Sequence, residues 1–163
     1  MRTIRKGDLL KRWIGCDVGA SGAFAMIPEE GDIEIYPMDR ALFREMCREW
    51  CMDECIACVE KVASSPQMGV KSAFSFGQSY EMVVTMLFAF YIPFVEVIPN
   101  KWKAEFSLKM GKDVPQAEKK KADIYACQKL HPKVSLRRTP KCRTDDDNYA
   151  DALLLATYAK RKF

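Results

Sequence analysis

Apolar residues in the first part of the chain fall into short runs that small and polar residues separate. Three runs, at residues 13–18, 23–27 and 33–36, are joined by segments short enough for tight turns and predict an antiparallel three-stranded meander. Two further runs, at residues 55–62 and 94–98, are almost continuously apolar, which is typical of strands buried on both faces. The pattern therefore predicts five strands.

Helical spacing of apolar residues marks the segments around the later strands. Asp39 is expected to cap a helix that extends to about residue 52, with its apolar residues on one face. Asn100 is expected to cap a short helix, and longer helices are predicted at residues 73–91, 115–130 and 146–160. This order predicts an α/β domain whose mixed five-stranded sheet combines the meander with two parallel strands and is flanked by helices.

Residues 82–90 are apolar on every side of a predicted helix. The segment is too short to span a bilayer and Pro93 follows it, which argues against a membrane protein. A helix that is apolar all round has to be covered all round. One face can lie on the sheet. The other either meets a second copy of the chain, which predicts a homodimer, or is buried in the core.

Charge is distributed unevenly along the 163 residues, which are enough for one domain with a full core. Residues 1–11 are basic and irregular and are predicted to form an arm that precedes a single domain at residues 12–163. Residues 1–98 carry 10 Lys and Arg against 14 Asp and Glu, whereas residues 99–163 carry 16 against 8. A basic second half favours a polyanionic partner such as a nucleic acid, although a basic surface without a partner has the same composition.

The seven cysteines have neither disulfide nor zinc-site spacing. Cys47, Cys51 and Cys55 are four residues apart and Cys58 follows three residues later, but no second ligand cluster accompanies them and His131 is the single histidine. We interpret the cysteines as buried, reduced thiols that pack as small apolar residues. Reduced thiols predict a reducing cytoplasm, which for a viral protein is that of the host cell.

Three separated acidic positions are the candidates for chemistry. Asp17 ends the first apolar run, Glu60 lies near the end of the fourth, and the run DDDNYAD at residues 145–151 opens the last helix. A carboxylate in an apolar strand, such as Glu60, is costly unless a partner compensates it. Asp151 poses the same problem, because the apolar run 152–156 follows it. Oxygen ligands favour Mg²⁺ or Mn²⁺ over zinc, and carboxylates that hold such ions can cleave phosphodiesters.

Simpler interpretations stay open for parts of this set. Asp17 and the glycines of DVGASG could form an ordinary turn, or the glycines could let a phosphate approach the backbone. The acids at residues 145–147 could be a charge cluster that the helix dipole favours. Asp147 and Asn148, however, lie four and three residues before Asp151, on the same face of the predicted helix.

Four segments of the chain, in this order, resemble the RuvC-like Holliday junction resolvases of the ribonuclease H-like superfamily. Their amino-acid sequences are most similar to those of phage-type members. IGCDVGASGAFAMI is similar to the family's first strand and hairpin, and CVEKVASSPQMGVKSAFSFGQSYEMV to its second acidic strand and long helix. EVIPNKWK and GKDVPQAEKKKADIYACQKLHP resemble the family's next strand and helices, and DDDNYADALLLATYAK resembles its closing helix. The resemblance covers residues 14–158. It implies a ribonuclease H-like fold and a homodimeric endonuclease that resolves four-way DNA junctions by paired symmetric cuts.

The resemblance also implies which residues act. The predicted catalytic residues and ligands of two Mg²⁺ or Mn²⁺ ions are Asp17, Glu60, Asp147 and Asp151. The bacterial pattern has an acid three residues before the last Asp, where this chain has Asn148. Asp147 is therefore preferred as the fourth ligand, and Asp146 is the alternative.

Contacts to the DNA are predicted for five lysines: Lys61, Lys71, Lys103, Lys112 and Lys121. Two of these, Lys103 and Lys121, lie where the family has lysines at the catalytic site or the phosphates. The family's aromatic wedge after the second acid is replaced by Ala63. Stacking at the junction centre therefore falls to Met68 or Phe74, or is absent.

Three other functions share parts of the pattern. A ribonuclease H-like nuclease that acts on flaps, forks or other branched replication intermediates would use the same acids. A branched-DNA binding module with weak cleavage would fit Asn148, which weakens the ligand set. An actin-like or sugar-kinase-type phosphotransferase shares DVGASG, but this chain has no second phosphate loop and is too short for two such lobes.

Overall fold

The computed structural model describes residues 10–19, 21–61 and 69–163. Five strands form one mixed sheet in the order β3-β2-β1-β4-β5. The strands are β1 (Lys11–Asp17), β2 (Ala23–Pro28), β3 (Glu34–Pro37), β4 (Glu54–Glu60) and β5 (Phe94–Val97). The β1–β2 and β2–β3 pairs are antiparallel, whereas the β1–β4 and β4–β5 pairs are parallel. The predicted meander, the two parallel strands and the α/β class are confirmed.

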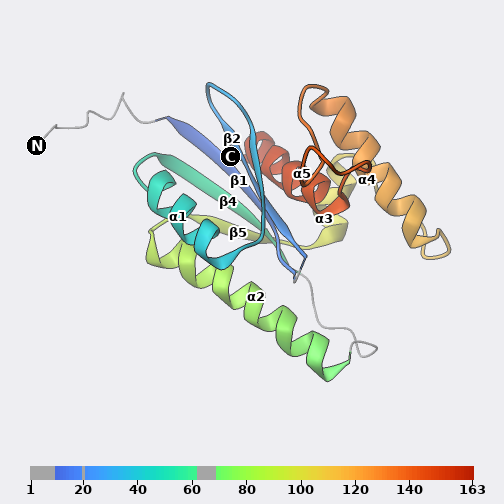
Figure 1. Ribbon diagram of the computed structural model, residues 1–163, viewed down its shortest axis with the longest axis horizontal. Coiled ribbons are helices and arrows are strands. Elements are labelled where there is room, and N and C mark those ends of the chain that lie inside the picture. Colours follow the sequence, from blue (N-terminus) through green and yellow to red (C-terminus); the bar gives the residue numbers. More distant parts are fainter. Residues whose placement is uncertain (1–9, 20, 62–68) are drawn as a thin grey trace, which may run out of the picture.

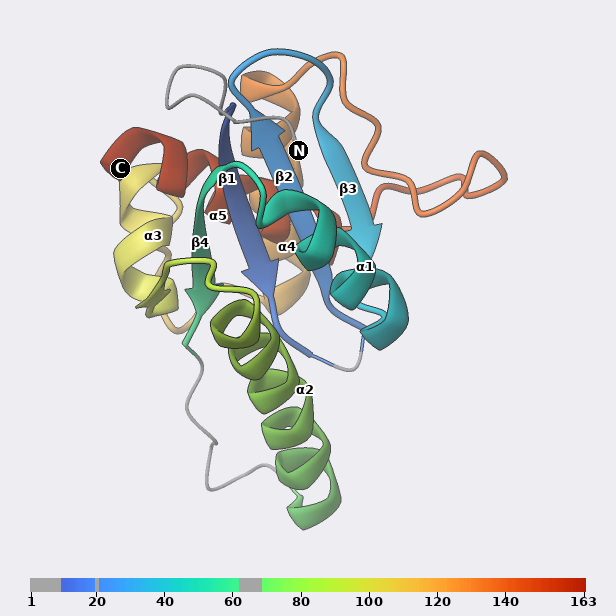
Figure 2. The same ribbon diagram turned by 90° about the vertical axis from the view of Figure 1, so that its left-hand side faces the viewer.

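Helices cover both faces of this sheet. Figure 1 shows α1 (Arg40–Trp50) and α2 (Val70–Ala89) on one face. The other face carries α3 (Pro99–Glu105), α4 (Gln116–Leu130) and α5 (Asp147–Lys162), and the turned view in Figure 2 shows the same layers. Each face has its own cluster of buried apolar side chains.

The helix α1 forms where the sequence predicts it. The Asp39 side chain caps it, because Asp39 Oδ1 accepts a hydrogen bond from the Leu42 backbone N–H at 2.9 Å. Phe43, Cys47 and Trp50 recur at helical spacing and are fully buried against the sheet. Local pattern and packing therefore agree in this element.

Gly15 lets α5 lie directly on the central strand. A Cβ atom on Gly15 would be 2.1 Å from the Ala152 carbonyl oxygen and 2.3 Å from the Ala156 backbone nitrogen. Only a residue without a side chain permits such an approach. Residues 152–159 of α5 are all buried. The contact fixes the first turns of α5 beside β1.

Several predicted boundaries are wrong, most clearly at the starts of β1, α2 and α3. β1 begins at Lys11, inside the segment predicted as an arm, and the remaining arm residues 1–9 lie outside the described residues. α2 begins at Val70 and not at residue 73, because the Ala73 N–H already bonds the Gly69 carbonyl at 2.9 Å. Asn100 is not a cap: α3 starts at Pro99, whose missing N–H costs nothing at the first helical position.

The other described residues leave one side of α2 uncovered. Val83 and Leu87 are its buried residues, whereas Val70, Phe74 and Phe88 are exposed. The alternative of a helix buried completely in the core is therefore wrong. Among the described residues, none of the helices combines the length and the hydrophobicity that crossing a membrane requires.

The cysteines are unpaired thiols. Four are buried, namely Cys16, Cys47, Cys58 and Cys127, and three are partly exposed, namely Cys51, Cys55 and Cys142. Burial raises the pKa of the Cys47 and Cys127 thiols to about 12, so these groups stay protonated. The prediction of reduced, packed thiols holds for the four buried residues.

Candidate active site

Two acids meet at the carboxyl edge of the parallel strands. Asp17 is the last residue of β1 and Glu60 the last of β4, and these neighbouring strands run parallel. Each side chain is 8% exposed. Burial, followed by the charges of Glu60 and Asp147, raises the pKa of Asp17 to about 7. Burial also raises the pKa of Glu60. Both carboxylates are therefore held where losing a proton is unfavourable unless a cation is near.

Asp151 reaches the same place from α5. Its pKa is raised well above the ordinary value by burial and by the charges of Asp123, Asp17 and Glu60, while Lys103 acts in the opposite direction. Asp151 Oδ1 is buried and has no hydrogen-bond partner among the described residues. The three acids predicted from separate parts of the sequence are thus brought together by two strand ends and one helix.

A fourth acid, Asp123 of α4, belongs to the site and is missing from the sequence prediction. It is 4% exposed, and its Oδ2 lies 2.6 Å from the Lys103 ammonium. The same ammonium lies 3.7 Å from Asp151 Oδ2. A signal was present: Asp123 and Cys127 are four residues apart and form the buried face of α4. An acid on a core-facing turn needs a partner, as we argued for Asp151.

Lys103, one of the lysines predicted to contact DNA, lies inside the acidic cluster. Its side chain is 22% exposed. Burial lowers its pKa, but the charges of Asp151 and Asp123 outweigh burial and raise the pKa above the ordinary value. Lys103 is therefore a fixed positive charge at neutral pH.

The candidates for the fourth metal ligand differ in their contacts. Asp147 Oδ2 lies 2.6 Å from the Lys120 ammonium, and its charge also raises the pKa of Asp17. Asp146 caps α5 by accepting from the Asn148 and Tyr149 backbone N–H groups. Its carboxylate is also paired with Arg138. Asp146 therefore has a structural role, and Asp147 stays the predicted ligand.

Gly22, the second glycine after Asp17, serves the chain's own turn. A Cβ atom on Gly22 would be 2.2 Å from the Asp17 carbonyl oxygen, and the Gly22 N–H donates to the Gly19 carbonyl at 3.1 Å. Arg138 also donates to the Ser21 carbonyl. Gly22 is thus required by the approach of β2 to β1, which favours the ordinary-turn interpretation of DVGASG over a phosphate loop.

The donor set suits a hard divalent cation by type and burial. It consists of carboxylate oxygens, and the buried, unpartnered Asp151 Oδ1 is the kind of atom that a cation would satisfy. As the side chains lie, the described part of the chain contains no group of three His, Cys, Asp or Glu residues arranged to hold one ion. The Lys103 ammonium lies between Asp123 and Asp151 instead. The metal ligands therefore stay a prediction.

The other lysines predicted to contact DNA lie at the surface. Lys71, Lys112 and Lys121 are exposed. Lys61 is also exposed and forms an ion pair of 3.2 Å with Glu96. Lys120, one residue before the predicted Lys121, pairs with Asp147. Of the stacking candidates, Phe74 is exposed on α2, whereas Met68, like Ala63, lies outside the described residues.

Comparison with known proteins defines the fold. No protein-family model and no curated protein matches the chain. Among solved structures, it is similar to T. thermophilus RuvC in complex with a Holliday junction substrate, with a TM-score of 0.55 and 15% identity over 94% of this chain and 96% of that one. It is also similar to a Thermus thermophilus RuvC structure, with a TM-score of 0.50 and 14% identity over 91% of each chain. The chain therefore has a RuvC-like, ribonuclease H-like fold.

Proposed function

We propose that this protein is a metal-dependent, structure-selective DNA endonuclease of the phage-type RuvC-like class, which resolves four-way junctions by paired symmetric incisions. The observation that carries the proposal is the meeting of Asp17, Glu60 and Asp151 at one edge of the sheet. The acids arise from three different elements of a RuvC-like fold. A structure with this fold is a RuvC in complex with a Holliday junction substrate, which supports branched DNA as the substrate class.

The residues that would hold Mg²⁺ or Mn²⁺ are Asp17, Glu60 and Asp151, with Asp147 as the fourth. Two such ions, when bound, supply an activated water and stabilise the leaving oxygen of a phosphodiester. The chain contributes acids whose burial strengthens their attraction to any cation, because the charges are little screened there. It also contributes rigid supports, since two of the acids end strands and the third lies on a buried helix.

Lys103 is expected to contact the substrate directly. Asp123 holds its ammonium at 2.6 Å, beside Asp151. From this position a lysine can donate to a phosphate oxygen and offset the negative charge that develops on it. Asp123 keeps the long lysine side chain in one place, so we assign it a positioning role.

Basic residues of the second half are expected to hold the arms of the DNA. Residues 99–163 carry 16 Lys and Arg against 8 Asp and Glu, and Lys112 and Lys121 are exposed there. Lys71 adds an exposed charge at the start of α2. Because such contacts release counterions from the DNA, affinity should fall steeply as salt is added.

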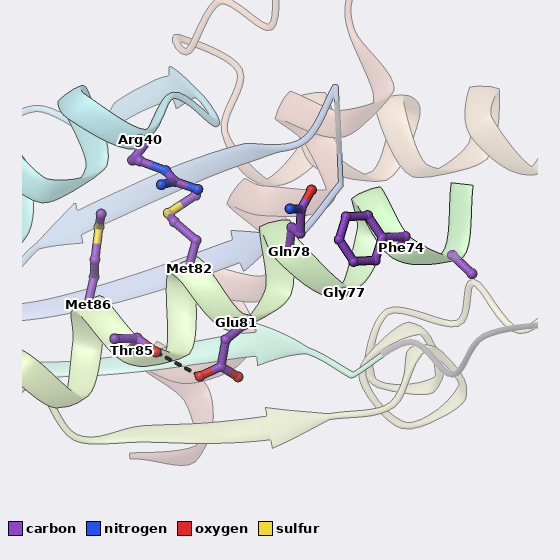
Figure 3. Close-up of a pocket in the computed structure, with 9 residues that line it drawn as sticks. Arg40, Phe74, Gly77, Gln78, Glu81, Met82, Thr85 and Met86 are labelled. Carbon is purple, nitrogen blue, oxygen red and sulfur yellow. Dashed lines mark hydrogen bonds between the residues drawn. The ribbon is translucent and has the colours of Figure 1, made fainter. Parts of the chain in front are cut away.

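A homodimer would place two sites on opposed strands of a two-fold junction. The uncovered side of α2 supports such an interface. A groove of about 680 Å³ lies there, lined by α2 residues and by Arg40 of α1. Figure 3 shows the side chains that line it. Phe74, Met82 and Met86 give the groove apolar walls. A second copy of α2 would cover these side chains, as the all-round hydrophobicity of the helix predicts.

The test compares Asp17→Asn with the wild-type chain on a synthetic four-way junction. Incision is mapped at nucleotide level in Mg²⁺, in Mn²⁺ and in EDTA, and junction binding is measured separately by gel shift. We expect wild type to cut in either metal and not in EDTA, and Asp17→Asn to bind normally but cut at least about 10³-fold more slowly. Asp113→Asn, which removes an exposed acid before α4, is the matched control.

Each other result rules out a part of the proposal. Unchanged incision by Asp17→Asn removes Asp17 from the site. Preferred cutting of a fork or flap over a mobile four-way junction assigns the protein to the alternative branched substrates. Tight binding without incision in any metal identifies a branched-DNA binding module, which the Lys103 ammonium inside the acid cluster would then explain.

A further inference from the structure

Glu60 receives a hydrogen bond from a tryptophan of another element. The Trp102 indole N–H, on α3, donates to Glu60 Oε1 at 2.9 Å. Of the described residues, Trp102 is the one whose side chain donates to this carboxylate. The bond counteracts the effect of burial on the pKa of Glu60 and thus favours its charged form. One of the two carboxylate oxygens is therefore committed to the protein.

Trp102 is itself held firmly. It is fully buried, and the ring of Phe106 packs against it edge-on, with the ring centres 6.4 Å apart. Pro99 starts its helix and fixes the entry of the chain. The Lys103 ammonium lies 4.8 Å from the centre of the indole ring. A short helix thus presents two consecutive side chains to the acid cluster.

We propose that Trp102 is a positioning residue for Glu60: its indole N–H fixes the carboxylate so that Oε1 faces the protein and Oε2 is left for a cation. The inference rests on the proposed function, because it gives Glu60 a cation to bind. A buried carboxylate without this donor could rotate about its last side-chain bonds. Outer partners of this kind set ligand orientation and typically change metal affinity about 10- to 100-fold.

The chain offers a matched control for the indole N–H. Trp50 is also fully buried, but its Nε1 has no hydrogen-bond partner among the described residues. Trp102→Phe and Trp50→Phe therefore remove the same atoms from buried sites, and only the first removes a hydrogen bond to an acid. Any effect of simple repacking should appear in both variants.

The experiment measures Mn²⁺ affinity by titration calorimetry on the full chain, and single-turnover incision of the four-way junction. We expect Trp102→Phe to bind Mn²⁺ about 10-fold more weakly and to cut about 10-fold more slowly, with junction affinity unchanged. Trp50→Phe should match wild type in all three measurements. Equal Mn²⁺ affinity of Trp102→Phe and wild type overturns the inference.

A second measurement does not require Trp102→Phe to fold. The chain has three tryptophans, so the losses in Trp13→Phe and Trp50→Phe assign the Trp102 indole signal in ¹H–¹⁵N spectra by elimination. We expect Mg²⁺ to shift the Trp102 signal and to leave that of Trp50 in place. If Mg²⁺ shifts the signals of other residues but not that of Trp102, the inference is also overturned.

The two proposals fail in different ways. If Mn²⁺ affinity depends on Trp102 but no branched DNA is cut, the nuclease proposal falls and the positioning role stands. If junctions are cut and Trp102→Phe binds Mn²⁺ as wild type does, the positioning role falls alone. If wild type binds no divalent ion, both are overturned.

Discussion

The two faces of the sheet are packed to different degrees. On the α5 face, the helix backbone touches the central strand at Gly15, and residues 152–159 are all buried. On the α2 face, the helix buries Val83 and Leu87 and leaves Phe74 and Phe88 exposed. The acid cluster lies at the edge of the closely packed face. The packing of α5 on β1 fixes the position of Asp151 in this cluster.

This difference suggests a division of labour. The proposed metal site needs ligands fixed to within a fraction of an ångström, and the contact at Gly15 holds α5 close against β1. The proposed dimer interface needs apolar surface that one copy of the chain leaves exposed, and α2 has such surface. The comparison can be tested by disturbing each face separately.

The largest effect is expected at Gly15. Gly15→Ala places a Cβ atom 2.1 Å from the Ala152 carbonyl oxygen, so α5 has to move away from β1. We expect a loss of about 4 kcal/mol or more in the free energy of unfolding, measured by urea denaturation. Gly77→Ala on α2 meets nothing within 4 Å and should stabilise the protein by about 0.5–1 kcal/mol. Similar effects of both changes would remove the contrast between the faces.

The next effect is the pH dependence of stability in a chelator. The pKa of Asp17 is raised in the folded protein from 3.8 to about 7, chiefly by burial. The folded state therefore binds this proton more strongly than the unfolded state, and stability should be lost as pH rises between these values. Asp17→Asn should remove a pH-dependent loss of about 4 kcal/mol in the free energy of unfolding between pH 4 and pH 8. Thermal unfolding at several pH values measures this loss. Parallel pH curves for the two proteins would contradict the burial of a charged Asp17.

A smaller effect is expected on the α2 face. Phe74→Asp puts a charge into the apolar groove and should weaken self-association about 30-fold, which corresponds to about 2 kcal/mol. Sedimentation velocity at several concentrations measures it, and stability of the monomer should barely change because Phe74 is 66% exposed. Tyr125→Asp on α4, where the ring is 67% exposed, is the control. If Phe74→Asp leaves association intact but weakens junction binding, Phe74 serves as the stacking residue.

The smallest effect is expected at Lys61, at the end of β4. Its ion pair with Glu96 is exposed, so Lys61→Met should change the free energy of unfolding by less than about 0.5 kcal/mol. If Lys61 contacts a phosphate, the slope of log affinity for junction DNA against log salt should fall by about 1. An unchanged slope would leave Lys61 as a partner of Glu96 alone.

The fold follows from the sequence where short-range pattern decides it. The strands come from apolar runs, and α1 comes from the Asp39 cap and one apolar face. The start of α2 was missed because Gly69, its cap, offers no side-chain signal. Boundaries of this kind depend on backbone geometry that residue types do not encode.

The site was predictable in part for a physical reason. Glu60 and Asp151 are acids in apolar stretches of sequence. Burying a carboxylate costs free energy unless a partner compensates its charge, so such acids indicate a partner. Asp123 was hidden because three lysines precede it at residues 119–121 and made it look like an exposed, solvated acid. Its pairing with Lys103, and that of Trp102 with Glu60, joins elements far apart in the chain. Such pairings become visible only when the helices are placed on the sheet.

The packing of α5 on β1 also has a consequence for folding during synthesis. Asp17 and Asp151 come from early and late parts of the polypeptide, so a ribosome exposes the first long before the second. Until the last helix has docked against Gly15, the pocket lacks one wall and one acid. Incomplete or locally melted molecules would therefore lack the complete acid cluster.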